Sequence, residues 1–503
     1  MNIKKVKEEI RRTIQAYLEK DEQGAYVMEE IHQRPVLLIG PPGIGKTAIM
    51  EQVAREARIG LVSYTITHHT RQSAIGLPYI ETREFDGQEY RVTEYTMSEI
   101  LGAVYEKMRR TGLREGILFI DEINCVSETL APTMLEFLQA KRFGQHKVPQ
   151  GWIICAAGNP PEYNRAVREF DVVTLDRVKK IEVDQDFDVW KEYAYTAGIH
   201  GSILSYLEIK KQNFYQVETG VDGIHFVTAR AWEDLSQMLY AYERQGLSPD
   251  RDLVAQYVQS PEIAVDFANY LELWYKYRRR YDIAGVLAGE IPQAMREAMQ
   301  RAAFDERISV IGMLFGGLHE NFREVHLART RLGILHEALK KYRDAQGNEY
   351  LTPQELFGSF VAEREERFRA DRRAELLTRD EEHVTGEALD ILREWQVALA
   401  DETGHADAFA KLKAAFGGLR AAFEEKQKQA GEQLDHAFAF VHECFGDGQE
   451  LVIFLTELTR NYYSMEYLNR VGNETFFQYN KMLLFRDREA ELREEISAMD
   501  GIW

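Results

Sequence analysis

The chain is 503 residues long and carries 82 acidic against 62 basic residues, a formal net charge of −20. This length predicts about three domains, and the acidic balance argues against broad, sequence-independent nucleic-acid binding, which needs a cationic surface. No apolar run approaches the roughly 20 residues that span a bilayer, so no membrane insertion is expected. The three cysteines are far apart and lack a metal-binding spacing, which favours a reducing, cytoplasmic compartment.

Residues 1–33 open with a helical pattern. Ile3, Val6, Ile10 and Ile14 recur at helical spacing between charged residues, which predicts an amphipathic N-terminal helix. The segment has neither the apolar stretch nor the cleavage site of a signal peptide, so we expect it to remain part of the folded protein.

Residues 34–184 alternate short apolar runs with helical segments. Five of the apolar runs have the length and composition of strands: residues 36–40, 60–66, 117–121, 152–158 and 179–183. Continuous apolar runs of this kind, separated by helices, are typical of a parallel sheet that is buried on both faces. We therefore predict an α/β domain in which a five-stranded parallel sheet lies between helices.

Helical patterns dominate the rest of the chain. We predict an all-helical lid domain over residues 185–283 and a further all-helical domain over residues 284–503. The highly charged residues 351–387 fit either a solvated helix or an exposed linker. Apolar residues from Phe409 to Phe445 repeat at steps of three and four, which fits a long antiparallel helical hairpin or a short coiled coil. Because only two clean heptads are present, we favour packing within the chain.

The segment GPPGIGKT, from Gly40 to Thr47, matches the phosphate-loop pattern GxxxxGK[ST]. It follows a predicted strand and precedes a predicted helix, and this context makes a chance match a poor explanation. Glycines let backbone N–H groups surround phosphates, and the helix N-terminus adds positive potential. We expect Lys46 to reach the β- and γ-phosphates of ATP and the Thr47 hydroxyl to ligate Mg²⁺. The expected nucleotide-binding residues are Gly40, Pro41, Pro42, Gly43, Ile44, Gly45, Lys46, Thr47 and Ala48.

Polar residues also follow two of the other predicted strands. Asp121 and Glu122 end the run ILFIDE, and Asn159 follows WIICAAG. Parallel strands present their ligand-binding edge at these ends. We expect Asp121 to hold Mg²⁺ through its water shell, Glu122 to polarise the attacking water, and Asn159 to hydrogen-bond the γ-phosphate and that water. Asn159 also fits a turn role before Pro160 and Pro161, and the two roles are compatible.

The motifs GPPGIGKT, FIDEIN, LEFLQAKRFG, AAGNP and TLDRV follow one another in this order. Their order resembles the MoxR branch of the AAA+ ATPases over about residues 34–242. The resemblance implies that Arg177, in TLDRV, is the arginine finger and that Arg230, in VTARAW, is the sensor 2 arginine. It also implies a β-hairpin insert at about residues 74–97.

Two positions depart from the pattern of that branch. Cys125 stands where a basic residue usually follows DEIN, and the aromatic residue that commonly follows the finger arginine is missing after Arg177. Arg168, in VREFD, is therefore the alternative arginine finger.

The resemblance implies an Mg²⁺-dependent ATPase that assembles into a ring, with a hexamer expected. It further implies a chaperone-like role in which a protein client is remodelled or activated, together with a von Willebrand factor A domain partner. Two other functions stay open. One is a nucleic-acid-stimulated motor, which the acidic balance opposes, and the other is a slow nucleotide-dependent switch or scaffold, which Glu122 and Asn159 oppose.

Overall fold

The computed structural model describes residues 1–68, 70–163, 167, 170–220, 223–347 and 350–482. The chain forms two compact units. The first consists of Met1–Trp190, Thr228–Arg230 and Glu366–Thr378, and the second of Lys191–Val227, Ala231–Glu365 and Arg379–Trp503. The first unit is discontinuous, because two short segments from later in the chain complete it. Among the described residues, no helix is both long and apolar enough to cross a membrane.

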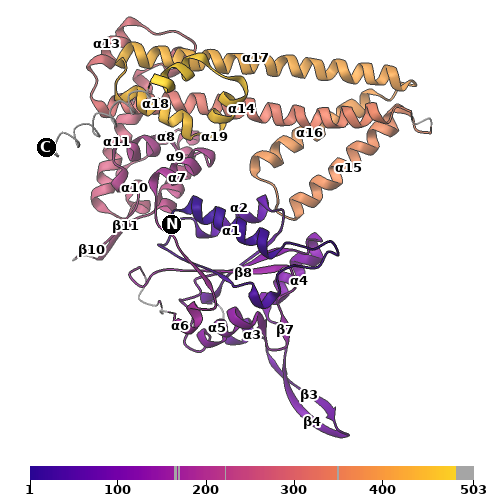
Figure 1. Ribbon diagram of the computed structural model, residues 1–503. Coiled ribbons are helices and arrows are strands. Elements are labelled where there is room, and N and C mark those ends of the chain that lie inside the picture. Colours follow the sequence, from indigo (N-terminus) through magenta and orange to yellow (C-terminus); the bar gives the residue numbers. More distant parts are fainter. Residues whose placement is uncertain (69, 164–166, 168–169, 221–222, 348–349, 483–503) are drawn as a thin grey trace, which may run out of the picture. The chain divides into compact units, whose positions relative to one another are not determined.

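The core of the first unit is a parallel sheet of five strands in the order β2–β5–β8–β1–β9 (Figure 1). The strands are β1 (Val36–Ile39), β2 (Gly60–Thr65), β5 (Gly116–Asp121), β8 (Trp152–Gly158) and β9 (Lys179–Glu182). Every residue of the central strand β8 is buried, as expected for a strand that is covered on both faces. The structure confirms the predicted α/β fold with its five-stranded parallel sheet.

Helices pack on this sheet through an apolar core. They are α1 (Ile3–Tyr17), α2 (Lys46–Glu56), α3 (Arg71–Ile75), α4 (Glu99–Thr111), α5 (Ala131–Ala140) and α6 (Val172–Leu175). Strands β6 (Arg142–Phe143) and β7 (His146–Lys147) form a short antiparallel hairpin. In α4, Ile100 and Val104 are fully buried, the Ser98 hydroxyl caps the first turn, and Gly112 ends the helix in a left-handed conformation. Burial of each of these two apolar side chains stabilises the fold by roughly 1.5–3 kcal/mol.

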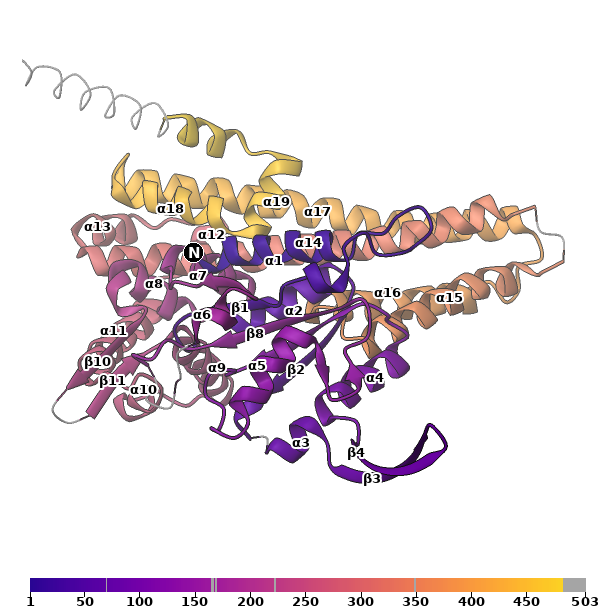
Figure 2. The same cartoon turned by 60° about the horizontal axis from the view of Figure 1, so that its bottom comes forward.

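An antiparallel hairpin extends away from the sheet of the first unit (Figures 1 and 2). Strand β3 (Pro78–Phe85) pairs with β4 (Gln88–Tyr95), and the two turn residues Asp86 and Gly87 both have positive φ, as a tight type I′ turn requires. The hairpin occupies the residues at which the family resemblance implied an insert. Its exposed large apolar side chains, with those of its flanks, are Leu77, Tyr79, Ile80, Phe85, Tyr90, Tyr95 and Met97.

Residues 366–378 complete the first unit through charge pairs. Glu375 accepts a hydrogen bond from the ammonium of Lys107 at 3.0 Å, and Asp371 pairs with Arg58. The Lys107 side chain is only 7% exposed, whereas that of Glu375 is 68% exposed, so the pair lies where the first unit meets solvent. This late segment therefore belongs to the packing of the unit.

The second unit is mostly helical. Its helices include α7 (Phe187–Thr196, which begins in the first unit), α8 (Gly201–Ile209), α9 (Ala229–Gln245, likewise), α10 (Arg251–Tyr257), α11 (Pro261–Arg280), α12 (Ile283–Leu287), α13 (Gln293–Arg301), α14 (Phe304–Asp344), α15 (Pro353–Arg373, which ends in the first unit), α16 (Arg379–Ala398), α17 (His405–Phe445), α18 (Gln449–Arg460) and α19 (Tyr462–Val471). One antiparallel hairpin, β10 (Gln216–Gly220) with β11 (Gly223–Val227), interrupts the lid that the sequence predicts to be all helical. Each strand has only five residues, and β10 carries a single apolar side chain, Val217, so the strand pattern is weak.

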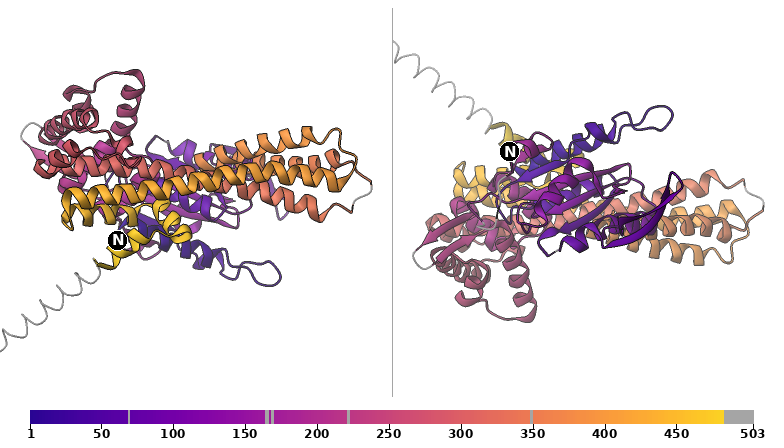
Figure 3. Two further views of the ribbon diagram at one scale, coloured as in Figure 1. Left: turned by 90° about the horizontal axis from the view of Figure 1, so that it is seen from above. Right: turned by 90° about the horizontal axis from the view of Figure 1, so that it is seen from below.

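Helices α14 and α17 are both 41 residues long and lie antiparallel (Figure 3, left). Glu324 pairs with Lys426, and Asn321 hydrogen-bonds Gln433, so residue numbers fall along one helix as they rise along the other. At 1.5 Å per residue each helix is about 60 Å long. The apolar pattern after Gly404 therefore forms one continuous helix. It packs within the chain, as we favoured, and its partner is the upstream helix α14.

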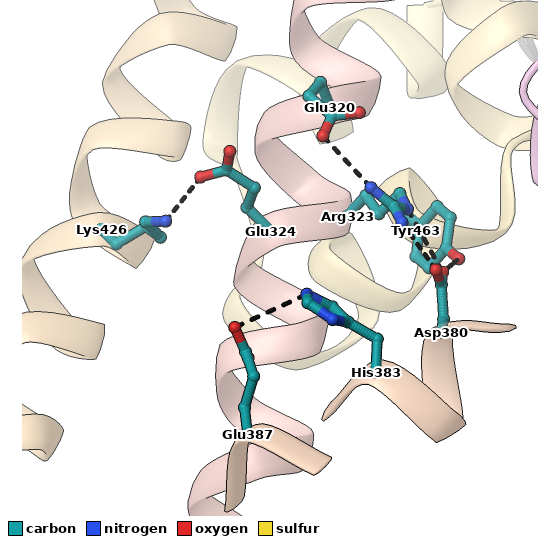
Figure 4. Close-up of polar contacts among 8 residues, drawn as sticks. All are labelled: Glu320, Arg323, Glu324, Asp380, His383, Glu387, Lys426 and Tyr463. Carbon is teal, nitrogen blue, oxygen red and sulfur yellow. Dashed lines mark hydrogen bonds and ion pairs between the residues drawn. The ribbon is translucent and has the colours of Figure 1, made fainter. Parts of the chain in front are cut away.

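A polar cluster joins α14, α16 and α19 (Figure 4). Arg323 of α14 donates hydrogen bonds to Asp380 at 2.6 and 3.2 Å, and the Tyr463 hydroxyl donates another at 2.9 Å. Asp380 lies in the first turn of α16, where the helix dipole also favours a carboxylate. Burial acts to raise the pKa of Asp380, but the hydrogen bonds from Arg323 and Tyr463 outweigh it and hold that pKa below its ordinary value.

Candidate active site

The phosphate loop of residues 40–47 connects β1 to α2. Gly43 and Gly45 have φ of 73° and 92°, a left-handed region that L side chains rarely adopt. A Cβ at Gly43 would also lie 2.9 Å from the hydroxyl oxygen of Thr228. Backbone conformation therefore demands both glycines, and close approach demands the first. The loop leads directly into the N-terminus of α2, whose free N–H groups favour a bound anion.

The base of the loop is fixed to the sheet. The N–H of Gly40 donates to the carbonyl of Gly158, at the end of β8, over 3.3 Å. A Cβ at Gly40 would meet the carbonyl oxygen of Val183 at 2.6 Å, so only glycine fits there. The loop therefore starts from a set position beside the ends of β8 and β9.

Lys46 is buried, with only 8% of its surface exposed. Its ammonium donates hydrogen bonds to the Gly40 carbonyl (2.7 Å), the Pro41 carbonyl (2.8 Å) and Asn159 Oδ1 (2.9 Å). These three oxygens replace water around the charge, and they join the phosphate loop to the residue that follows β8.

The surroundings of Lys46 lower its pKa to about 8. Burial is the main cause. The carboxylates of Asp121 and Glu122 act in the opposite direction, and the positive charge of Arg230 adds to the lowering. The ammonium is therefore short of compensating negative charge, and an anion placed beside it would favour its charged form.

Thr47 and Asp121 form an oxygen pair suited to Mg²⁺. The Thr47 hydroxyl donates to Asp121 Oδ2 over 3.0 Å, which brings the first turn of α2 to the last residue of β5. Hydroxyl and carboxylate oxygens are the ligand types that Mg²⁺ takes, with one or two carboxylates completed by water and substrate phosphates. Among the described residues, no cluster of three or more His, Cys, Asp or Glu side chains could hold a metal ion by itself. The residues present fit an Mg²⁺ that phosphate oxygens help to bind.

Glu122 follows β5 in an unusual conformation. Its φ is 57°, in the left-handed region, and its N–H donates to Asp121 Oδ1 over 2.9 Å. Such a conformation in a non-glycine residue costs of order 1 kcal/mol and tends to mark functional sites. The carboxylate is held by Thr67, whose hydroxyl donates to Glu122 Oε2 over 3.0 Å. Sequence reasoning missed Thr67. Its position just after β2 would have placed it beside the end of β5 if the strand order had been known.

Asn159 lies where the sequence places it, at the end of β8, with its amide oxygen on the ammonium of Lys46. A second residue that sequence reasoning missed, Asn124, contacts its backbone. Asn124 Nδ2 donates to the Asn159 carbonyl over 2.7 Å. The structure therefore brings Lys46, Asn159 and Asn124 into one hydrogen-bonded chain.

The two arginines singled out by the family resemblance differ in their surroundings. The backbone N–H of Arg230, in the first turn of α9, donates to the Gly43 carbonyl over 3.3 Å, so Arg230 lies beside the phosphate loop. Arg177 is exposed, and its guanidinium donates to Gln139 Oε1 over 2.6 Å. The alternative finger, Arg168, lies outside the described residues.

Comparison with known proteins agrees with this geometry. The model of the ATPase family associated with various cellular activities (AAA) matches residues 36–177, from β1 to the end of the turn that follows α6. This part of the chain is an AAA family domain, and such a domain supports nucleotide-dependent ATPase activity.

A solved structure is also similar to part of the chain. A crystal structure of a putative ATPase from Cytophaga hutchinsonii is similar at 16% sequence identity with a TM-score of 0.22. The match covers 36% of this chain and 46% of that one, so it spans less than half the length of its neighbour. No curated protein matches the sequence.

Proposed function

We propose that this chain hydrolyses ATP with Mg²⁺ as a subunit of a ring, and that the ring remodels or activates a protein client. One observation carries the ATPase part: the ends of β5 and β8 meet the phosphate loop. Thr47 lies 3.0 Å from Asp121 through their oxygens, and Lys46 lies 2.9 Å from Asn159. The AAA family domain at residues 36–177 supports the same reaction.

The phosphate loop is the proposed binding site for the nucleotide. Residues Gly40–Ala48 offer backbone N–H groups at the start of α2, and Lys46 offers its positive charge to the β- and γ-phosphates. Thr47 and Asp121 are the residues that would hold Mg²⁺, and this ion, when bound, neutralises charge on the phosphates. Because the Lys46 pKa is lowered, a bound triphosphate also favours the charged ammonium over the neutral amine.

Glu122 is the proposed group that polarises the attacking water. Its carboxylate is anchored by Thr67, so it starts from a defined position. Asn159 is proposed to orient that water and the γ-phosphate with its amide, whose oxygen Lys46 restrains. Positioning of this kind, together with electrostatic stabilisation, accounts for most of the catalysis of phosphoryl transfer.

Arg177 is the proposed residue that acts on a neighbouring subunit. It is exposed and bonded to Gln139, whereas Arg230 lies beside its own phosphate loop and is proposed as the sensor 2 arginine. An arginine supplied by a neighbour raises the rate of hydrolysis by roughly 10³–10⁵, so assembly into a ring would increase turnover. A hexamer is the proposed ring size.

The client role has a different support. It rests on the order of motifs that resembles MoxR proteins, which also suggests a partner with a von Willebrand factor A domain. The exposed apolar side chains of the β3–β4 hairpin, Ile80 and Phe85 among them, add a surface of the kind that contacts other proteins.

Two variants test the proposal against the parent protein. Lys46→Ala should lose ATP binding, because the main charge that neutralises the β- and γ-phosphates is gone. Glu122→Gln should bind ATP normally and hydrolyse it at least about 100-fold more slowly, because an amide cannot polarise the water. Undiminished ATP affinity in the first variant, or turnover within a few-fold of the parent in the second, would contradict the assignment.

The same Glu122→Gln protein, held in its ATP form, is the bait with which a protein client is captured. Turnover of the parent should not change with single- or double-stranded DNA at moderate salt, because the chain is strongly acidic. Strong, salt-sensitive stimulation by DNA would favour a nucleic-acid motor instead.

A further inference from the structure

We infer that Asn124 is a positioning residue for ATP hydrolysis, because its side chain holds the backbone of Asn159. This role rests on the proposed ATPase function and adds a residue to its site. Asn124 lies two positions after Glu122 and is 5% exposed. It binds neither phosphate nor water in this scheme and acts only through Asn159.

A single amide holds both backbone groups of Asn159. Asn124 Nδ2 donates to the Asn159 carbonyl over 2.7 Å, and Asn124 Oδ1 accepts from the Asn159 N–H over 3.3 Å. Strands β5 and β8 are parallel, and in a parallel ladder the N–H and the carbonyl of one residue bond two different residues of the neighbouring strand. Here one side chain makes both bonds, so Asn124 ties the residue that follows β8 to the chain that follows β5.

A side chain makes this link because the main chain leaves the sheet here. The N–H of Ile123 donates to the Ala157 carbonyl over 2.9 Å, and the left-handed Glu122 has by then turned the chain out of the strand. On the other side, Pro160 follows Asn159 and restricts it to extended conformations. The backbone of Asn159 is therefore fixed from two directions, by a side chain and by a proline.

The consequence is a set position for the Asn159 amide, whose oxygen lies 2.9 Å from the ammonium of Lys46. Gly158 leaves room for this arrangement. A Cβ at Gly158 would lie 2.5 Å from Asn124 Oδ1, so any other residue there would push the Asn124 side chain away. Asparagine suits the role because it combines a donor and an acceptor at this length. Aspartate lacks the donor, and glutamine is one methylene longer.

A double-mutant cycle on the full-length protein tests the inference. Asn124→Ala should lower kcat by about 10- to 100-fold and leave KM for ATP within about threefold, because misplacement of a catalytic group affects the chemical step. In an Asn159→Ala background the same change should lower kcat by less than about threefold, since there is no amide left to position. Gly158→Ala should reproduce the loss of kcat while keeping the Asn124 amide.

Asn461→Ala is the matched control. Asn461 is also a fully buried asparagine, it caps α19, and it should affect unfolding without affecting kcat. If Asn124→Ala does not fold, Asn124→Asp replaces it in the cycle, because it keeps the volume and loses the donor. Equal losses of kcat in both backgrounds, or a rise in KM at constant kcat, would overturn the positioning role while the ATPase function stands. Absence of hydrolysis by the parent protein would overturn both.

Discussion

The lowered pKa of Lys46 gives ATP affinity a defined dependence on pH. In the free protein, burial lowers this pKa to about 8. At about pH 9.5 only about 3% of free molecules would then carry the charge. A bound triphosphate favours the ammonium, so binding above pH 8 must recruit a proton. Affinity should therefore fall about 25-fold between about pH 7.5 and about pH 9.5, which is about 2 kcal/mol.

The measurement is a titration with a fluorescent ATP analogue, carried out in the Glu122→Gln background so that nucleotide is not consumed. Phosphate groups are fully ionised above about pH 7.5, so their own titration does not contribute. Calorimetry in buffers of different ionisation enthalpy should show uptake that approaches one proton at the upper end of this range.

Lys46→Arg is the control for this experiment. A guanidinium stays charged throughout the range, so whatever affinity the variant has should not change with pH. The reasoning would be refuted by a flat affinity in the protein with Lys46, or by an equal decline in the protein with arginine.

The remaining predictions concern assembly, the site and stability. Arg177→Ala should bind ATP and fail to hydrolyse it, and mixing it with Glu122→Gln should restore steady-state turnover above the sum of the two; no gain in rings that exchange subunits would argue against action on a neighbour. Thr67→Val should lower kcat by about tenfold at unchanged ATP affinity, because it frees the carboxylate of Glu122, and an unchanged kcat would deny that bond a role. Asp380→Asn should lower the free energy of unfolding in urea by about 1–3 kcal/mol. The deficit should be full above the unfolded pKa of Asp380 and shrink as pH falls through its lowered folded pKa, so a deficit independent of pH would contradict the pairing with Arg323.

The sheet could be read from the sequence because its signal is local. Each of the five strands is a short apolar run, and burial on both faces demands such runs whatever the rest of the chain does. The expected positions of Asp121 and Asn159 followed from the same rule, since parallel strands end at one edge. Lys46 could be placed as well, because its loop has a fixed spacing of glycines.

Residues that act through tertiary pairing could not be read in this way. Thr67 is a single polar residue in the short 3-10 helix after β2, and Asn124 is one in the turn after β5. Only the strand order β2–β5–β8 brings them to Glu122 and Asn159. The packing partner of α17 is α14, about a hundred residues upstream, and an apolar repeat does not indicate which helix it packs against. The role of residues 366–378 was hidden for the same reason, because a charged run looks like a solvated face until its partners are known.

Most of this chain must be synthesised before all segments of its first unit are present. The last segment of that unit ends at Thr378, about three quarters of the way along 503 residues. Domains usually fold as they leave the ribosome, N-terminal first, but here Lys107 cannot pair with Glu375 until residue 375 has been synthesised. A prematurely terminated product that stops before residue 366 would contain every motif of the site and still lack the carboxylates that pair with Lys107 and Arg58. Completion of the ATPase unit is thereby tied to translation of the helical region inserted within it.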